Sequence, residues 1–258
     1  MCVQNQFERI GNQNMKIVST IEARIGSTRL PGKVMKEIVG KPMLELLIER
    51  LKRAKRIDEI IVATTIKPED RIIVKLTKRI NIKCFRGSSE DVLDRVLRAT
   101  KAYQGNIIVE ITGDCPLLDP ELVDRIIKIY LENEYDYVSN RIKMTYPRGL
   151  DAQVFSVNIL DEVSKLTNDP ADRENVSLYI YEHPKKYKLC NIKAPPEHHH
   201  PEYRWTVDTE EDLQFVKAIY ENLYYENPYF RTGDIMKLLE EQPDLCKINA
   251  NIEQKPVR

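Results

Sequence analysis

Apolar, β-branched stretches alternate with amphipathic helical patterns through the first 140 residues, and this alternation limits the possible folds more than any other feature. Between the apolar stretches, apolar residues recur with the spacing of a helix. Alternating strands and helices build a mainly parallel sheet with helices on both faces. The sequence therefore predicts an α/β fold, a three-layer αβα sandwich around a Rossmann-like sheet. We expect strands over 16–23, 59–65, 82–87, 106–114 and 135–140, and helices over 43–56, 68–80, 88–103 and 119–134.

The second half of the chain is less regular. There we expect strands over 149–157, 188–194 and 204–209, and helices over 171–183, 210–226 and 232–242. No Ser/Gly-rich linker and no internal repeat interrupts the chain, so we expect residues 15–258 to form one domain with a substrate-binding insertion at about 141–203. The polar residues 1–14 are interpreted as a disordered tail, or as residues upstream of a natural start at Met15.

Capping residues mark three of the predicted helix starts. Asp119 is expected to cap the helix that continues with Pro120. Thr209 and the acid three residues later have the spacing of a capping box. Ser88 is expected to cap its helix in the same way, with Asp91 as the partner acid.

Composition excludes several classes of protein. Lys and Arg together number 40, as do Asp and Glu, and a net charge of zero argues against bulk binding of nucleic acid. The five cysteines lie far apart without a CxxC pair, which disfavours a zinc site or a disulfide framework. No apolar run approaches the roughly 20 residues that span a bilayer. We therefore expect a cytoplasmic protein with neither a nucleic acid nor a membrane as partner.

One short segment, IEARIGSTRLPGKV at 21–34, concentrates positive charge and glycine directly after a predicted strand. The pattern GxxxxGK[ST] fails, because Gly26 and Gly32 are one residue too far apart and Val34 follows Lys33. GxGxxG is absent as well. Closely approaching amides and three cations nevertheless suit a triphosphate, although a solvated basic loop is the plain alternative. The residues in question are Arg24, Gly26, Ser27, Arg29 and Lys33.

Two aspartates each follow a predicted strand. Asp114 comes after the strand over 106–114, and Asp208 lies at the end of the one over 204–209. If those strands are neighbours, the two carboxylates can share one Mg²⁺ through oxygen ligation. Considered singly, each aspartate could be no more than a turn or cap residue.

Motifs along nearly the whole chain resemble the SpsF-like cytidylyltransferases, relatives of the CMP-KDO and CMP-sialic acid synthetases. The matching segments are ARIGSTRLPGKVM, GKPMLELLIERL, FRGSSEDVLDRVLRA, ITGDCPLLDP, YDYVSN, TYPRGLDAQVF, RENVSLYI, RWTVDTEEDL and DIMKLLEEQP. The resemblance implies a nucleotide-diphospho-sugar transferase fold. It also implies a nucleotidyltransferase that moves CMP from CTP to a sugar acid, sugar or phosphorylated acceptor and releases pyrophosphate. Such a reaction serves the biosynthesis of surface polysaccharides or glycoconjugates.

The resemblance assigns roles position by position. Arg24 and Lys33 would be catalytic, because they offset the charge that develops on the phosphates. Asp114 and Asp208 would hold Mg²⁺. Residues implied to bind the nucleotide are Ala23, Arg24, Gly26, Ser27, Arg29, Lys33, Gly87, Ser88 and Asp91, and those implied to shape the acceptor pocket are Asn140, Tyr146, Pro147, Asp151, Gln153, Arg173, Glu174 and Asn175.

Three positions depart from the family pattern, in which we expect Glu at Gln153, His at Asn175 and Thr at Ser177. The first two place an amide where an ionisable group is expected. An amide can bind a hydroxyl group but cannot act as a base near neutral pH. We therefore expect these positions to tune the choice of acceptor.

Alternatives remain open at this point. A related enzyme could use UTP or GTP, and a nucleotide-binding regulator without turnover is a further possibility. The run His198–His200 lies among prolines, which is typical of a solvated loop. The tyrosines at 220, 224, 225 and 229 could belong to the core or to a self-association surface. A homodimer is plausible from the resemblance.

Overall fold

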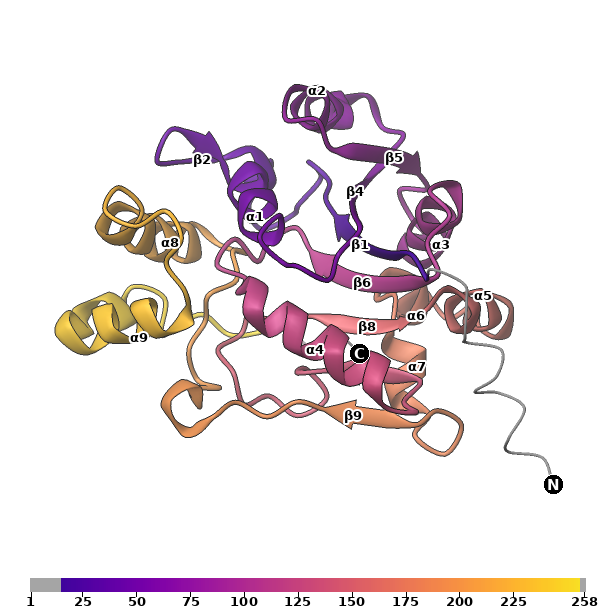
Figure 1. The fold of residues 1–258 in the computed structure, drawn as a ribbon. Helices are drawn as coiled ribbons and strands as arrows, with labels where there is room; N and C mark the ends of the chain where they lie inside the picture. The colour runs from indigo at the N-terminus through magenta and orange to yellow at the C-terminus, as the bar shows by residue number, and fades with distance from the viewer. Residues whose placement is uncertain (1–14, 256–258) are drawn as a thin grey trace.

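A computed structural model of the protein describes residues 15–255, within which seven strands form one mixed sheet between layers of helices (Figure 1). The predicted tail over 1–14 lies outside the described residues. The strand order is β5-β4-β1-β6-β8-β7-β9, and β2 and β3 form a separate small hairpin. The strands are β1 (Ile17–Glu22), β2 (Glu37–Ile38), β3 (Lys41–Pro42), β4 (Glu59–Thr65), β5 (Lys83–Gly87), β6 (Ile107–Thr112), β7 (Tyr137–Ser139), β8 (Gln153–Ser156) and β9 (Leu189–Asn191).

The first half of the chain forms the parallel part of the sheet, which confirms the predicted fold class. Strand β1 pairs in parallel with both β4 and β6, and β4 pairs in parallel with β5. From the region predicted as an insertion, β8 enters antiparallel between β6 and β7, and β9 continues the sheet beside β7. The region over 141–203 therefore contributes two strands to the same sheet.

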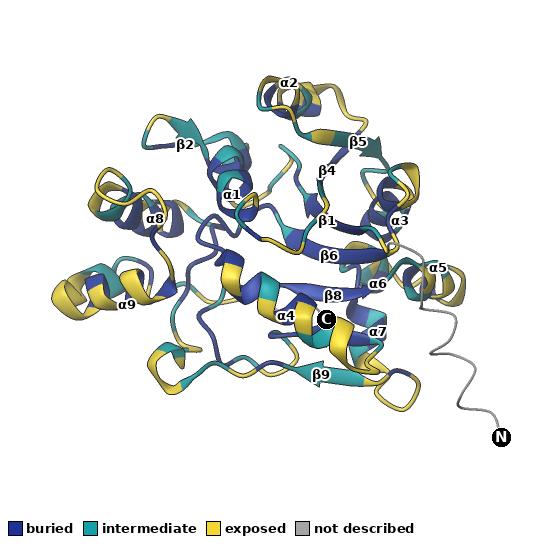
Figure 2. Cartoon of the chain, in the orientation of Figure 1, coloured by how far each residue is buried: buried dark blue, intermediate teal, exposed yellow. Residues whose placement is uncertain are grey.

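Helices cover both faces of this sheet. Helices α3 and α5 pack together on one face, while α1 and α4 lie on the other. In Figure 2 the strands β1, β6 and β8 are dark blue, and the exposed residues lie on the outer sides of the helices. The helices are α1 (Met43–Leu51), α2 (Arg71–Arg79), α3 (Val92–Ala102), α4 (Pro120–Glu132), α5 (Val157–Leu166), α6 (Pro170–Glu174), α7 (Leu178–Glu182), α8 (Glu210–Leu223) and α9 (Thr232–Glu241).

Three local predictions were wrong. The helix over 171–183 is two short helices, α6 and α7, because the backbone at Asn175 leaves the helical region at φ −112° and ψ 86°. The strand over 204–209 is only an isolated bridge between Arg148 and Arg204. Asp91 rather than Ser88 caps α3, since its side chain accepts a hydrogen bond from the Asp94 amide at 2.8 Å. The predicted caps Asp119 and Thr209 are confirmed.

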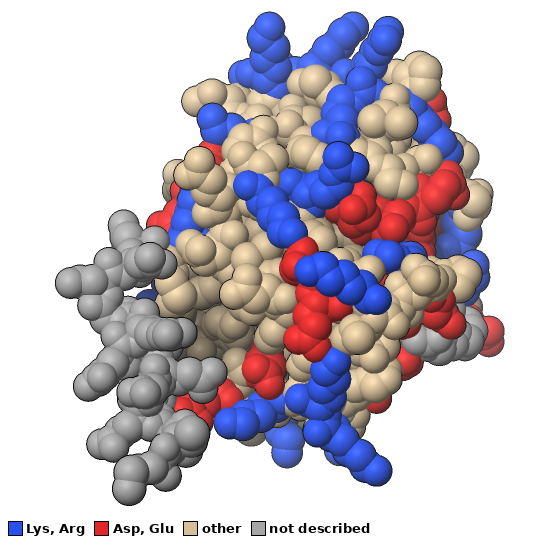
Figure 3. Space-filling view, turned by 90° about the vertical axis from the view of Figure 1, so that its right-hand side faces the viewer, with Lys and Arg blue, Asp and Glu red and all other residues tan. Residues whose placement is uncertain are grey.

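Surface charge is mixed on the side of the molecule that bears α3 and α5. Figure 3 shows Lys and Arg side chains interspersed with Asp and Glu on that face. Neither sign covers that face by itself, in keeping with the zero net charge of the chain.

Candidate nucleotide-binding site

A cleft of about 440 Å³ opens where β1 and β6 end. The segment after β1 forms one wall, Gly113 and Asp114 after β6 lie at its base, and Asp208 comes from the segment before α8. Ligands of open α/β sheets bind at such carboxyl ends of parallel strands. The lining residues are Glu22, Ala23, Arg24, Gly26, Ser27, Thr28, Arg29, Lys33, Val34, Val92, Arg95, Thr112, Gly113, Asp114, Arg141, Glu174, Asn175, Asp208, Gln254 and Lys255.

Lys33 joins the two aspartates in this cleft. Its Nζ donates hydrogen bonds of 2.8 Å to Asp114 Oδ2, to Asp208 Oδ1 and to the Val207 carbonyl. Burial by itself lowers the pKa of the Lys33 ammonium, but the two carboxylates outweigh burial and hold that pKa above its ordinary value. Burial likewise raises the pKa of Asp114, and Lys33 more than reverses the effect. Lys33 therefore keeps Asp114 ionised and brings both carboxylates around one ammonium.

Asp208 is further surrounded by arginines. Arg204 Nη2 lies 2.6 Å from Asp208 Oδ2, and Arg29 Nη2 lies 3.0 Å from Asp208 Oδ1. Arg204 also contacts Asp212, whose carboxylate accepts hydrogen bonds from the Asp208 and Thr209 amides. This network fixes Asp208 at the start of α8, so the carboxylate has a defined direction into the cleft.

Close backbone contacts bring the two aspartates together although they are far apart in the sequence. The Val207 amide donates to the Asp114 carbonyl at 2.8 Å. At Gly113 an added Cβ would lie 2.6 Å from the Glu22 carbonyl oxygen, so only glycine lets β6 pass this close to β1. Gly149 has φ +102°, and a Cβ there would lie 2.5 Å from the Thr206 nitrogen. The segment 204–208 is thus positioned by tight packing rather than by membership of the sheet.

The donor set fits a divalent metal that is shared with a ligand. Asp114 Oδ2 and Asp208 Oδ1 each lie 2.8 Å from the same nitrogen, so both can reach one ion placed between them. No group of three or more His, Cys, Asp or Glu side chains within residues 15–255 could hold a metal. Mg²⁺ commonly binds through one or two carboxylates together with waters and substrate phosphates. Two aspartates therefore suffice once a phosphate is present, provided that the Lys33 ammonium moves out of the gap.

The basic segment after β1 forms the wall of the cleft opposite the two aspartates. Arg24 Nη2 forms a 2.7 Å ion pair with Glu174 Oε1, and Arg24 Nη1 donates to the Ser89 carbonyl at 3.3 Å. Gly26 and Ser27 line the cleft beside it. Cationic forks and closely approaching amides can hold phosphate oxygens. The wall and the aspartate pair together suit a phosphate chain with a bound metal.

A family model described as cytidylyltransferase matches residues 18–237. The chain belongs to the cytidylyltransferase family. Its relatives include an uncharacterized protein of Methanocaldococcus jannaschii, which is 40% identical over 95% of this chain and 98% of its own length. The spore coat polysaccharide biosynthesis protein SpsF of Bacillus subtilis is 34% identical over 88% of this chain and 95% of its own.

A solved structure agrees with this membership. The cytidylyltransferase of Leptospira borgpetersenii serovar Hardjo-bovis superposes with a TM-score of 0.86 at 30% identity, over 94% of this chain and 100% of that one. Within the described part of this cytidylyltransferase, no helix is both long and apolar enough to cross a membrane.

The residues predicted to bind the base and the acceptor are divided between the cleft and the interior. Only Glu174 and Asn175 of the acceptor set line the cleft. Ser88 lies just outside its lining, where its carbonyl accepts from Arg95 Nη1 at 2.5 Å. Gly87 and Asp91 are likewise absent from the cleft lining.

Several residues of the predicted acceptor set are buried and contact the backbone near β7 and β8. Asn140 is buried and clamps the Leu150 carbonyl and the Ala152 amide at 2.9 and 3.0 Å. Tyr146 and Pro147 are buried nearby. Arg173 donates to the Ser164 carbonyl at 2.9 Å and lies 3.5 Å from Asp91 Oδ2.

Gln153, one of the departures from the family pattern, is 2% exposed and faces the core. Its Oε1 accepts hydrogen bonds from Tyr137 and from Ser177, the latter at 2.6 Å. Gln153 also pairs directly with Glu110 across the β6–β8 ladder. Burial raises the pKa of Glu110 to about 7. Since like charges directly opposite each other destabilise a sheet, an amide at 153 avoids a buried pair of carboxylates.

Sequence reasoning missed four charged residues of the cleft. Glu22 ends β1, Arg95 lies on α3, Arg141 follows β7, and Lys255 lies beyond α9. Burial, reinforced by Glu110, raises the pKa of Glu22 well above its ordinary value. Burial also lowers the pKa of Arg95, although Glu22 opposes that effect. The position of Arg141 directly after a predicted strand was a usable signal, whereas the helical residue Arg95 offered none.

Asp151, also predicted for the acceptor, lies close to Arg141. Burial raises the pKa of Asp151, and the charge of Arg141 opposes this rise. Its Oδ1 has no hydrogen-bond partner among the described residues. Asp151 itself does not line the cleft, whereas Arg141 does.

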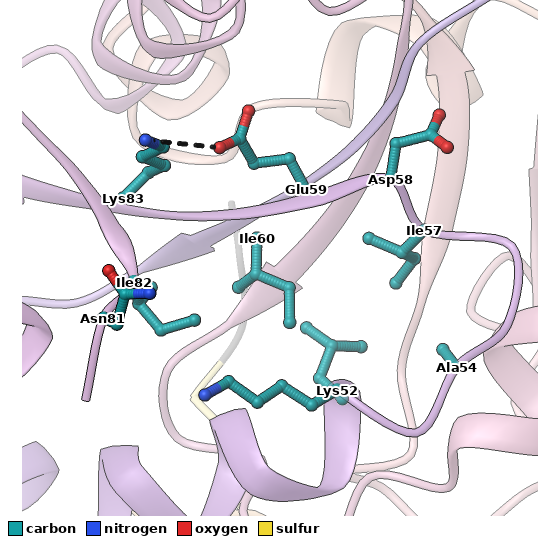
Figure 4. A pocket seen from close by; sticks show the side chains of 10 residues that line it. Lys52, Ala54, Ile57, Asp58, Glu59, Ile60, Asn81, Ile82 and Lys83 are labelled. Atoms are coloured by element: carbon teal, nitrogen blue, oxygen red, sulfur yellow. Dashed lines mark ion pairs between the residues drawn. The ribbon is translucent and has the colours of Figure 1, made fainter.

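A separate hollow of about 350 Å³ lies at the opposite ends of the strands (Figure 4). It is bordered by the starts of β4 and β5, and Lys83 and Glu59 form an ion pair of 3.9 Å above it. The hollow contains none of the predicted site residues. Its lining is Leu51, Lys52, Ala54, Ile57, Asp58, Glu59, Ile60, Asn81, Ile82 and Lys83.

Proposed function

We propose that the protein transfers CMP from CTP to a sugar acid, sugar or phosphorylated acceptor and releases pyrophosphate. Membership of the cytidylyltransferase family supports this reaction. The name of the related SpsF protein supports a place in polysaccharide biosynthesis. The observation that carries the proposal is the meeting of Lys33, Asp114 and Asp208 at the base of a cleft walled by basic residues.

In this proposal the triphosphate lies along the wall formed by Arg24, Gly26, Ser27 and Arg29. The guanidinium forks and the loop amides bind phosphate oxygens, and Lys33 turns from the aspartates toward the phosphates. Displacement at the α-phosphorus needs positioning and charge stabilisation more than covalent chemistry from the protein. These cations provide both, because they hold the chain of phosphates in place and offset the charge on departing pyrophosphate.

Asp114 and Asp208 would hold Mg²⁺. When bound, the ion would supply Lewis-acid polarisation of the phosphate. The protein's own contribution is to aim both carboxylates at one point, and the Arg204 and Arg29 contacts hold Asp208 in that position.

The acceptor would bind at the end of the cleft lined by Arg141, Glu174 and Asn175. Asn175 can donate to and accept from a hydroxyl but takes up no proton near neutral pH. We therefore assign it to orientation of the acceptor. Asn140, Tyr146, Pro147 and Gln153 would act from beneath, by supporting the backbone of this region.

Thermal stabilisation by each of the four ribonucleoside triphosphates with Mg²⁺ tests the nucleotide. A ligand at 100 times its dissociation constant stabilises by about 2.7 kcal/mol. We expect a shift confined to CTP and lost in Lys33→Ala, while Lys36→Ala, a nearby surface lysine, keeps it. Equal shifts with all four nucleotides would remove the assignment to cytidine and leave UTP and GTP open.

Release of pyrophosphate with a panel of sugar acids, sugars and phosphorylated acceptors tests turnover. No release with any acceptor, despite tight binding of CTP, would favour a nucleotide-binding regulator. We further propose that residues 15–258 act as one domain in the cytoplasm, and that a homodimer is the working assembly. Sedimentation of the full chain tests the assembly.

A further inference from the structure

Two arginines near the carboxyl end of α1 have guanidinium nitrogens without partners. Arg50 is 3% exposed, and its Nε donates to the Leu118 carbonyl at 2.8 Å. Neither Nη1 nor Nη2 of Arg50 has a hydrogen-bond partner among residues 15–255, and the same holds for Arg53 Nη2. Buried guanidinium N–H groups without acceptors are costly, and native proteins rarely leave them unpaired. The pair therefore points to an anion that the described chain does not supply.

One acid, Asp119, interacts with both arginines electrostatically but does not pair with them. Its Oδ1 accepts from the Glu121 amide, and its Oδ2 accepts from the amide and the hydroxyl of Thr232. Burial lowers the pKa of Arg53, and the charge of Arg50 adds to this effect. The two guanidinium groups are thus close enough to repel each other.

These arginines lie where two surface hollows meet. One hollow of about 440 Å³ is lined in part by Arg50. The other, of about 810 Å³, lies beside the start of α4. Arg53 and Tyr229 line both hollows. Neither hollow shares a lining residue with the nucleotide cleft. The cations that line them are Lys41, Arg50, Lys52, Arg53, Lys55, Arg56, Arg125, Lys128 and Arg231, and the acids are Glu49, Glu121 and Asp124.

The acids of the hollows are already engaged. Glu49 pairs with Lys41, and Glu121 pairs with Arg231. Asp124 accepts hydrogen bonds from the Lys55 and Arg56 amides at 2.8 and 2.9 Å. Because the whole chain is neutral, this excess of cations is a local feature. It gives the hollows a positive potential that attracts anions.

We propose that the two hollows form one site, called here the Arg50 site, that binds a phosphate-bearing small molecule outside the nucleotide cleft. Arg53 lies half-buried at the wall, where its Nε donates to the Arg50 carbonyl at 3.4 Å and its unpartnered Nη2 is left to donate to a phosphate oxygen. Arg50 lies at the floor, with its Cζ 4.4 Å from the centre of the Phe230 ring and its Nη1 and Nη2 left to donate to the anion. Tyr229 is 67% exposed over Arg53 and forms the rim. A phosphate suits the site better than a single carboxylate, because it brings more negative charge and more acceptor oxygens to the surplus of cations that line the hollows.

Titration calorimetry with inorganic phosphate, pyrophosphate and CMP, each added separately to the full chain, tests the proposal. Arg53→Gln should weaken binding at one site about tenfold or more, because it removes a charge-assisted contact. Arg53→Lys keeps the positive charge but lacks the planar guanidinium, so its binding affinity should fall by an intermediate amount. Arg71→Gln on α2 is the matched control, since it removes one exposed arginine away from the hollows.

Pyrophosphate also separates this site from the proposed nucleotide site. Wild type should bind two pyrophosphates, Arg53→Gln one and Lys33→Ala one. If the proposed function is wrong, Lys33→Ala leaves binding unchanged while the Arg53→Gln effect persists. The Arg50 site is overturned if no probe binds outside the cleft, or if Arg53→Gln and Arg71→Gln behave alike. The probe with the strongest binding identifies the source of the phosphate.

Discussion

Replacing Lys33 with methionine isolates the central electrostatic contact of the cleft. The change keeps much of the side chain's length but removes the ammonium that contacts Asp114 and Asp208. The lysine and Asp208 side chains are 12% and 11% exposed, and Asp114 is 24% exposed. Breaking a buried ion pair by removing one partner costs about 3–5 kcal/mol. Because Arg29 and Arg204 still contact Asp208, we expect a loss of about 3 kcal/mol in the free energy of unfolding.

A divalent ion should reverse much of that loss. In Lys33→Met the two carboxylates face a gap with no ammonium in it, so Mg²⁺ can bind there without displacing one. At 100 times its dissociation constant, Mg²⁺ adds about 2.7 kcal/mol to the free energy of unfolding. Urea unfolding followed by circular dichroism, with EDTA or with Mg²⁺, measures both effects. We expect Mg²⁺ to stabilise the variant more than wild type.

Lys36→Met is the control for this experiment. Lys36 lies 3.5 Å from Glu210, and the two side chains are 36% and 52% exposed. Exposed pairs contribute at most about 1 kcal/mol, so this variant should stay close to wild type. The reasoning is refuted if Lys33→Met loses no more than the control, or if Mg²⁺ stabilises wild type and Lys33→Met equally.

Three further changes test other parts of the site. Glu110 has a pKa near 7 when folded and an ordinary value of 4.5, so the folded state holds its proton longer and stability falls as pH rises between these values. The free energy of unfolding of Glu110→Gln, measured with urea, should therefore rise relative to that of wild type by up to about 3 kcal/mol from pH 4.5 to 8. Glu174→Gln releases Arg24 from an exposed pair and should tighten CTP binding by a factor of about 2–5 in calorimetry. Gly149→Ala forces a Cβ against the Thr206 backbone and should destabilise the protein by about 2 kcal/mol in thermal unfolding.

Each of these has a contrary outcome. A pH-independent difference for Glu110→Gln means that the carboxyl is not protonated in the folded protein. Weaker CTP binding in Glu174→Gln places that acid in nucleotide binding rather than in competition for Arg24. Unchanged stability in Gly149→Ala shows that the 204–208 segment can move aside.

The sequence by itself was sufficient to predict the layers of the fold and the residues that meet at the base of the cleft. Strand and helix periods depend on which side chains face the core, a property that is local and directly visible in the sequence. The carboxyl ends of parallel strands meet at one edge, so the loop after β1 and Asp114 after β6 could be expected together. The structure does bring Lys33, Asp114 and Asp208 within contact distance.

Only the tertiary structure decided how Asp208 comes to lie beside Lys33 and Asp114, and which other side chains line the cleft. Asp208 reaches the cleft through the Val207–Asp114 backbone contact and the space left at Gly149, not through a strand of the sheet. Gln153 faces the core opposite Glu110, although its motif suggested the acceptor pocket. Such placements depend on contacts between residues far apart in the chain. Local periodicity contains no information about those contacts, because the same short pattern can meet different distant neighbours, and those neighbours decide its final structure.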